Sequence, residues 1–160
     1  MVRGEVQKAA ALVYVAVAAG LCLAGSRVDG VGLRSGCPIW ERLSYPFLHA
    51  GFFHFAINAW CLLTVVFGYG VSGRLLVVSY IIAVTAPAFG ATAPTVGLSG
   101  VLYAVFGALS FKVRRKWLWQ TWWAVPLAVG FLLPKVNAWL HLYCYLCGIL
   151  VGFLGKPVHR

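Results

Sequence analysis

The sequence predicts an all-α membrane protein, built as one bundle of six transmembrane helices. Of its 160 residues, 62% are hydrophobic and only 10% are charged. A water-soluble domain of this length cannot bury so much apolar surface. Six apolar segments each approach the length of about 20 residues that a spanning helix needs. We therefore expect residues 1–160 to form a single membrane domain with the lipid bilayer as its solvent.

The spans are expected to follow one another with short connections, apart from a long first loop, Ser26–Leu48. This loop contains apolar and aromatic residues beside its charges, so we expect it to lie partly in the membrane interface, with Trp40 and Arg42 as anchors. The six spans are expected, in order, at Lys8–Gly25, Gly51–Tyr69, Arg74–Ala93, Gly97–Phe111, Trp117–Leu133 and Ala138–Leu154.

Five of the six spans contain residues that bear on their role. The first follows the basic residues Arg3 and Lys8 and precedes the small residues at Ala24–Ser26, so a signal peptide is the alternative to a spanning helix. The fifth contains Pro126 and Gly130, which both weaken a membrane helix. The second, fourth and sixth carry the few polar side chains.

The basic residues predict a multi-pass protein of the cell membrane with both termini in the cytoplasm. In this orientation nine lysines and arginines face inward: Arg3, Lys8, Arg74, Lys112, Arg114, Arg115, Lys116, Lys156 and Arg160. Four face outward: Arg27, Arg34, Arg42 and Lys135. The net charge of +10 is spread between apolar runs, except in the segment KVRRK. This distribution fits anionic lipid, and we expect no nucleic-acid partner.

Polar groups inside a membrane are costly, so each one is a candidate site. The candidates are His49, His54, Asn58, Ser99 and His141. The only carboxylates lie in the N-terminal tail or first loop: Glu5, Asp29 and Glu41. The absence of acidic residues from the spans excludes a two-aspartate protease and an H-E-x-x-H zinc protease. It also disfavours a proton-driven transporter. We expect no metal and no cofactor.

The spacing of these residues favours acyl transfer. His54 and Asn58 are four residues apart, so they share a helix face and both can donate hydrogen bonds. Ser99 lies near a helix start, where free N–H groups favour a developing negative charge. His141 could act as the base. Each residue also has an alternative explanation, since a serine between glycines commonly packs helices and a buried histidine commonly links them.

Two pairs of residues are not expected to bind a metal or to act in redox chemistry. His49 and His54 are five residues apart and would not share a helix face, which argues against a two-histidine metal site. Cys144 and Cys147 lie in an apolar helix without partner cysteines, and we interpret them as small packing residues.

Three segments in this order resemble the rhomboid intramembrane serine proteases: HAGFFHFAIN, GLSGVLYAVFG and HLYCYLCGILVG. The segment WERLSYPFLH is similar to the family's first loop. The resemblance implies Ser99 as nucleophile and His141 as general base and acid. It further implies an oxyanion hole of His54, Asn58 and the Ser99 N–H, with Tyr103 bracing the imidazole and His49 as structural support.

The same resemblance implies transmembrane protein substrates that enter beside the fifth span, which would be a lateral gate. Two residues depart from the family pattern: Cys144 replaces a glycine, and Leu140 replaces a common alanine. We expect the larger residues to hold the sixth helix slightly farther from the fourth. Two alternatives remain, a non-catalytic rhomboid-like protein that binds membrane proteins as a scaffold or quality-control factor, and a small channel or transporter.

Overall fold

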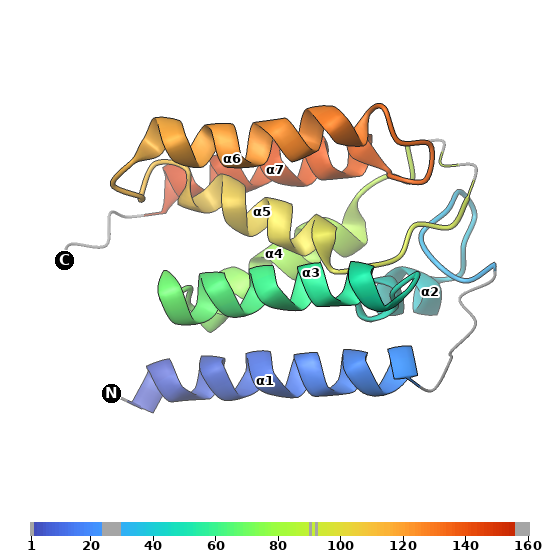
Figure 1. Ribbon diagram of the computed structural model, residues 1–160, viewed down its shortest axis with the longest axis horizontal. Coiled ribbons are helices and arrows are strands. Elements are labelled where there is room, and N and C mark those ends of the chain that lie inside the picture. The colour runs from blue at the N-terminus through green and yellow to red at the C-terminus, as the bar shows by residue number, and fades with distance from the viewer. Residues whose placement is uncertain (1, 24–29, 90, 92, 156–160) are drawn as a thin grey trace.

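The computed structural model describes residues 2–23, 30–89, 91 and 93–155, and this part of the chain is helical apart from its connections. Long helices that follow one another along the chain run in opposite directions, so α1 begins and α7 ends at the same end of the bundle (Figure 1). The helices are α1 (Val2–Leu23), α2 (Ile39–Ser44), α3 (Phe52–Leu63), α4 (Gly73–Thr85), α5 (Ser99–Leu109), α6 (Lys116–Gly130) and α7 (Ala138–Leu154). A 3₁₀ turn, η1 (Tyr45–Phe47), follows α2, and a π-helical turn, η2 (Thr64–Gly68), extends α3.

Helix α1 begins at Val2, earlier than the expected Lys8. The polar residues ahead of Lys8 include good helix formers, and Lys8 pairs with Glu5 one turn away at 3.0 Å. Further along, Tyr14 donates a hydrogen bond to the Pro46 carbonyl, and Gln7 accepts one from the Gly73 N–H at 3.2 Å. These contacts join α1 to the first loop and to the start of α4. The small residues at 24–26, and Arg27, Asp29, Lys156 and Arg160, lie outside the described residues.

Helix α4 ends at Thr85, and the expectation that it reaches Ala93 is wrong. The physical reason is Pro87, because a residue before proline avoids helical backbone and Ala86 is extended with ψ 146°. Arg42 donates to the carbonyls of Val84 and Ala86 at 3.2 and 2.6 Å, which satisfies this helix end. Arg42 is therefore a cap of α4, a role that was not expected, and its place in the membrane interface stays a prediction.

A long connection, residues 86–98, consequently joins α4 to α5, where a short one was expected. It is held to the first loop by a pair of backbone hydrogen bonds between Leu33 and Thr95, at 2.9 and 3.0 Å. This pairing fixes the chain just ahead of Ser99.

Helix α5 lies at the centre of the bundle, and every residue from Gly100 to Leu109 is buried. It packs most closely on α7, where glycines remove the side chains between the two backbones. A Cβ on Gly152 would lie 2.5 Å from the Ala108 carbonyl oxygen, and one on Gly148 would lie 2.8 Å from the Ala104 carbonyl carbon. Such contacts are typical of membrane helices that associate through small residues.

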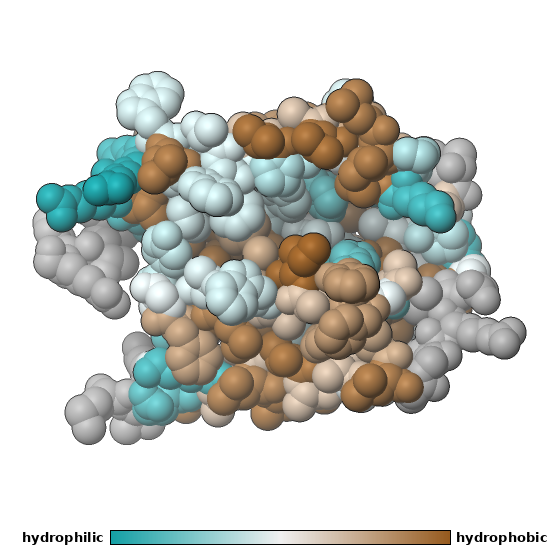
Figure 2. Space-filling view, in the orientation of Figure 1, coloured by the Kyte–Doolittle hydropathy of each residue, from teal (hydrophilic) through white to brown (hydrophobic). Residues whose placement is uncertain are grey.

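Among the described residues, one helix is long and apolar enough to cross a membrane by itself, over Gly4–Leu23. A second would qualify if the pair Ile39–Phe47 and Phe52–Gly68, bent by 79°, counts as one span. Helix α5 has 11 residues and is only about 16 Å long at 1.5 Å per residue. On the face shown in Figure 2, hydrophilic residues lie mainly toward the two ends, with apolar surface between them.

Candidate active site

Ser99 and His141 lie against each other at one end of the bundle. Ser99 is the first residue of α5, and His141 is in the first turn of α7. The hydroxyl Oγ of Ser99 is 2.8 Å from Nε2 of His141, a hydrogen-bond distance. His141 is buried and Ser99 is half-buried. A serine hydroxyl that is hydrogen-bonded to an imidazole is the arrangement of an activated nucleophile and its base.

The backbone ahead of Ser99 is held in place by a buried tyrosine. Tyr45 is fully buried in η1, and its carbonyl accepts a hydrogen bond from the Gly97 N–H at 2.9 Å. Its hydroxyl donates to the Ala83 carbonyl at 3.0 Å, so Tyr45 also binds α4. Gly97 has φ +112°, which other residues rarely adopt. Tyr45 was not predicted as a site residue, and nothing in the sequence marks its contact with Gly97.

Helix α7 is positioned by Asn137, which sequence reasoning also missed. Its Oδ1 accepts from the Leu140 N–H at 3.1 Å, which caps the helix. Its Nδ2 donates to the Ala88 carbonyl and the Thr95 hydroxyl at 3.3 and 3.1 Å. Asn137 thus ties the start of α7 to the connection that leads into Ser99. An asparagine directly before an apolar helical run is an N-cap signal that could have identified it.

Tyr103 packs on the imidazole of His141, and Cys144 lies at the contact of α7 with α5. The ring of Tyr103 stacks on the imidazole, with the ring centroids 4.5 Å apart and the planes 18° apart. Cys144 is fully buried one turn later and faces α5, with Sγ 3.6 Å from where a Cβ on Gly100 would lie. Leu140 is fully buried too. Cys144 and Leu140 were expected to hold α7 slightly farther from α5, and with both residues in place His141 still reaches Ser99.

His54 and Asn58 approach the same point from α3. A Cβ on Gly97 would lie 2.7 Å from Nε2 of His54 and 3.7 Å from Nδ2 of Asn58, so both side chains lie beside the glycine two residues before Ser99. Nδ1 of His54 accepts from the Ala50 N–H at 3.4 Å, which leaves Nε2 of the neutral ring as the donor. Nδ2 of Asn58 donates to the His54 carbonyl at 2.8 Å.

Comparison with protein families gives one decisive result. The model of the Rhomboid domain matches residues 37–157, about three quarters of the chain. The chain belongs to the rhomboid family. This result confirms the family inferred from the three sequence motifs. Neither the curated proteins nor the solved structures contain a match. Rhomboid proteins are membrane proteins, so this helical bundle lies in a membrane.

In this rhomboid protein His49 lies in the turn before α3, not on the helix. The argument that His49 and His54 occupy different helix faces was therefore wrong in its premise. The two rings meet edge to face with centroids 5.2 Å apart, and His49 also packs edge-on against Phe55 at 5.5 Å. His49 is buried, and its ring nitrogens have no hydrogen-bond partner among the described residues. His49 therefore packs between the rings of His54 and Phe55.

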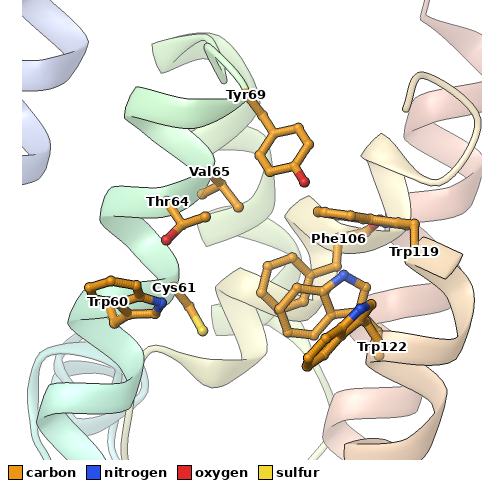
Figure 3. A pocket seen from close by; sticks show the side chains of 9 residues that line it. Trp60, Cys61, Thr64, Val65, Tyr69, Phe106, Trp119 and Trp122 are labelled. Atoms are coloured by element: carbon orange, nitrogen blue, oxygen red, sulfur yellow. The ribbon is translucent and has the colours of Figure 1, made fainter. Parts of the chain in front are cut away.

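A cavity of about 200 Å³ separates α3 and η2 from α6, and we call it the aromatic cleft. Figure 3 shows residues of α3 and η2 on one side, residues of α6 on the other and Phe106 of α5 between them. Its lining consists of Trp60, Cys61, Thr64, Val65, Tyr69, Phe106, Trp119, Trp122 and Trp123. Only Phe106 comes from the close-packed centre, where its ring stacks on Trp123 at 3.4 Å. Helix α6 therefore contacts the bundle mainly through aromatic rings.

The first loop contains a buried carboxylate that is not part of the site. Glu41 accepts hydrogen bonds from the Gly32 N–H at 3.1 Å and from the Arg34 guanidinium, in which Nη2 is 3.1 Å from Oε1. Burial favours a higher pKa for this carboxyl, but the Gly32 N–H and the Arg34 charge together hold the pKa of Glu41 below its usual value. Glu41 stabilises the loop that carries Tyr45.

Proposed function

We propose that this rhomboid protein is an intramembrane serine endopeptidase that hydrolyses peptide bonds in or near transmembrane segments of other proteins. The observation that carries the proposal is the distance of 2.8 Å between Ser99 Oγ and His141 Nε2. In the proposed reaction His141 takes the hydroxyl proton as Ser99 attacks the scissile carbonyl, then returns it to the leaving amine. Water hydrolyses the acyl-enzyme with His141 again as base.

The negative charge that develops on the carbonyl oxygen needs hydrogen-bond donors. The Ser99 N–H is at the start of α5, where the first N–H groups of a helix have no partner within it. His54 Nε2 and Asn58 Nδ2 lie beside the adjacent Gly97 and are the proposed side-chain donors. Loss of one such donor typically costs about 3 kcal/mol of transition-state stabilisation.

No carboxylate orients His141 in this proposal, so packing must do so. The ring stack with Tyr103 and the close approach of α7 to α5 hold the imidazole toward Ser99. The roles proposed from the sequence are retained: Ser99 as nucleophile, His141 as base and acid, Tyr103 as brace and His49 as structural support.

We further propose a single domain of six spans with both termini in the cytoplasm, because the basic residues predict this orientation. Ser99 and His141 then open toward the outer side. Substrates would be single-span membrane proteins with a locally unwound outer segment and a small residue at the cut. Helix α6 is the proposed lateral gate, because the aromatic cleft separates it from α3 and because the helix contains Pro126.

The test is cleavage of a generic transmembrane substrate by the purified protein in liposomes. Ser99→Ala and His141→Ala should each abolish cleavage, whereas Ser79→Ala should not. Ser79 is a suitable control because it is fully buried in α4 and its hydroxyl has no partner among the described residues. Labelling by a fluorophosphonate should require Ser99. Cleavage by Ser99→Ala equal to that of the unmodified protein would refute the proposal.

A second candidate is a rhomboid-like protein that binds membrane proteins without cutting them. The observation in its favour is that Cys144 and Leu140, which depart from the family pattern, both lie fully buried beside His141. Capture of a transmembrane protein that is equal for the unmodified protein and Ser99→Ala, with no product from either, would support it.

A further inference from the structure

A second cleft continues from the aromatic cleft toward the α5–α6 connection, and we call it the basic cleft. It has a volume of about 340 Å³ and is lined by Tyr69, Val113, Arg114, Arg115, Leu118, Trp119 and Trp122. Tyr69, Trp119 and Trp122 also line the aromatic cleft. The two clefts therefore adjoin each other, and we call the pair of them the groove between α3 and α6. The basic cleft is at the opposite end of α5 from Ser99, so it is separate from the candidate active site.

The walls of the basic cleft are aromatic and firmly placed. Trp119 is buried, and its Nε1–H donates to the Phe106 carbonyl at 3.2 Å. Tyr69 packs against Trp119 with ring centroids 4.9 Å apart. Trp122 is 67% exposed, so it forms an outer wall that is open sideways to the membrane. Such a surface suits a hydrocarbon chain at the depth where tryptophan is favoured.

The mouth of the basic cleft is strongly positive. Arg114 and Arg115 are exposed and line it, and Lys112 and Lys116 flank them. The whole chain has only three acidic residues, and none lines this cleft in the described structure. Neither guanidinium group has a hydrogen-bond partner within the described part of the chain. Two such groups above an aromatic wall match a phosphate on a hydrocarbon chain, since guanidinium binds phosphate with two parallel hydrogen bonds.

We propose that the basic cleft binds one acidic phospholipid of the inner leaflet. Arg114 and Arg115 would hold the headgroup phosphate, and an acyl chain would lie along Trp119 and Trp122 into the groove. The inference goes beyond the proposed function, because it needs no reaction at Ser99 and uses only the predicted orientation. A soluble acidic ligand would make no use of the aromatic wall, which opens to the side of the bundle.

Native mass spectrometry of the full chain in detergent can test this proposal. The protein is titrated with dioleoylphosphatidylglycerol, with dioleoylphosphatidylcholine and, as a headgroup without acyl chains, with glycerol phosphate. We expect one phosphatidylglycerol to bind, and both other compounds to bind at least about tenfold more weakly. Each arginine near a lipid headgroup favours binding about fivefold, so Arg114→Gln/Arg115→Gln should weaken binding about twenty-five-fold.

The chain offers a matched control for the arginines at the mouth of the basic cleft and another for its tryptophan wall. Lys112→Gln/Lys116→Gln removes the same charge from the same connection, but neither lysine lines the cleft, and Nζ of Lys112 lies near Gly155 instead. It should weaken binding by less than about threefold. Trp122→Ala should weaken binding, whereas Trp117→Ala should not, because Trp117 is 88% exposed and outside the cleft. Arg114→Lys/Arg115→Lys keeps the charge but loses the paired hydrogen bonds, so it should bind more tightly than Arg114→Gln/Arg115→Gln and less tightly than the unmodified protein. This intermediate affinity would exclude unfolding as the cause of the loss in the glutamine variant.

Three results would overturn the proposal. If the arginine and lysine double variants lose equal affinity for phosphatidylglycerol, the lipid is attracted by the overall positive charge of this connection and not by a defined site. Equal binding of phosphatidylcholine would mean that the groove accepts only hydrocarbon, as from a substrate helix. Binding of glycerol phosphate as tight as that of phosphatidylglycerol would mean a site for free phosphate.

Discussion

Helices α5 and α7 touch through glycines, whereas α3 and α6 are separated by a cavity of about 200 Å³ lined with large aromatic side chains. At Gly107 a Cβ would lie 2.8 Å from the Ile149 nitrogen, so not even a methyl group fits between α5 and α7. At Trp60 and Trp122, by contrast, the side chains are mostly exposed. The comparison teaches that Ser99 and His141 lie on the closely packed side of the bundle, while the proposed gate lies on the side with the cavity.

The largest effect is expected from filling the close contact with Gly148→Val. The added atoms would collide with the Ala104 backbone, push α7 away and separate His141 from Ser99. Overpacking of this kind typically destabilises by about 1–3 kcal/mol, and proteolysis should fall to the level of Ser99→Ala. Cleavage in liposomes and thermal unfolding measure the two effects.

The control for Gly148→Val is Gly20→Val, because a Cβ on Gly20 in α1 meets nothing within 4 Å. It should leave cleavage unchanged. A Gly148→Val protein with full activity would show that the close contact of α5 and α7 does not position His141.

A smaller effect is expected from Asn137→Ala, which loosens the rigid side without filling it. The change removes the cap of α7 and the hydrogen bonds to Ala88 and Thr95. Loss of a cap costs about 1 kcal/mol of stability, and a small displacement of His141 should lower kcat about ten- to a hundredfold. Asn137→Asp keeps the acceptor for the Leu140 N–H and loses only the donor, so its kcat should lie between those of the unmodified protein and Asn137→Ala. Activity of Asn137→Ala equal to that of the unmodified protein would contradict this role.

A change at the aromatic cleft should raise the rate of cleavage, where changes between α5 and α7 lower it. Trp60→Ala widens the aromatic cleft, and a change of about 0.5–1 kcal/mol in gate opening corresponds to about two- to fivefold faster cleavage. The gain should appear for a transmembrane substrate and not for a short soluble peptide, because the chemistry is unchanged. Trp40→Ala is the control, since Trp40 is also exposed but lies in α2. A gain of the same size with the peptide would place the effect of Trp60 on the reaction instead.

The smallest effect is expected outside both regions, at Glu41. Its folded pKa is lowered, so its contribution to the free energy of unfolding is present above the unfolded pKa of about 4.3 and is lost as the pH falls through the folded value. Unfolding followed between pH 7 and pH 3 should show this loss, and Glu41→Gln should remove it. An identical pH dependence in Glu41→Gln would mean that another group is responsible.

The sequence predicted much of the site because residues within one helix have fixed relations. A spacing of four places His54 and Asn58 on one face of α3, and the structure has both beside Gly97. The same rule failed for His49, because it assumed a helix where the chain turns. It failed again at α4, where hydropathy continues past Thr85 but Pro87 does not permit the helix.

By itself, the sequence determined that the chain is helical, apolar and a rhomboid, since composition and ordered motifs need no knowledge of the fold. Only the tertiary structure decided that Ser99 and His141 are 2.8 Å apart although 42 residues separate them. That distance depends on how closely α5 and α7 approach, which is set jointly by the glycines of both helices, by Cys144 and by the cap at Asn137. Sequence spacing fixes positions along one helix, but contacts between helices come from packing against all their neighbours.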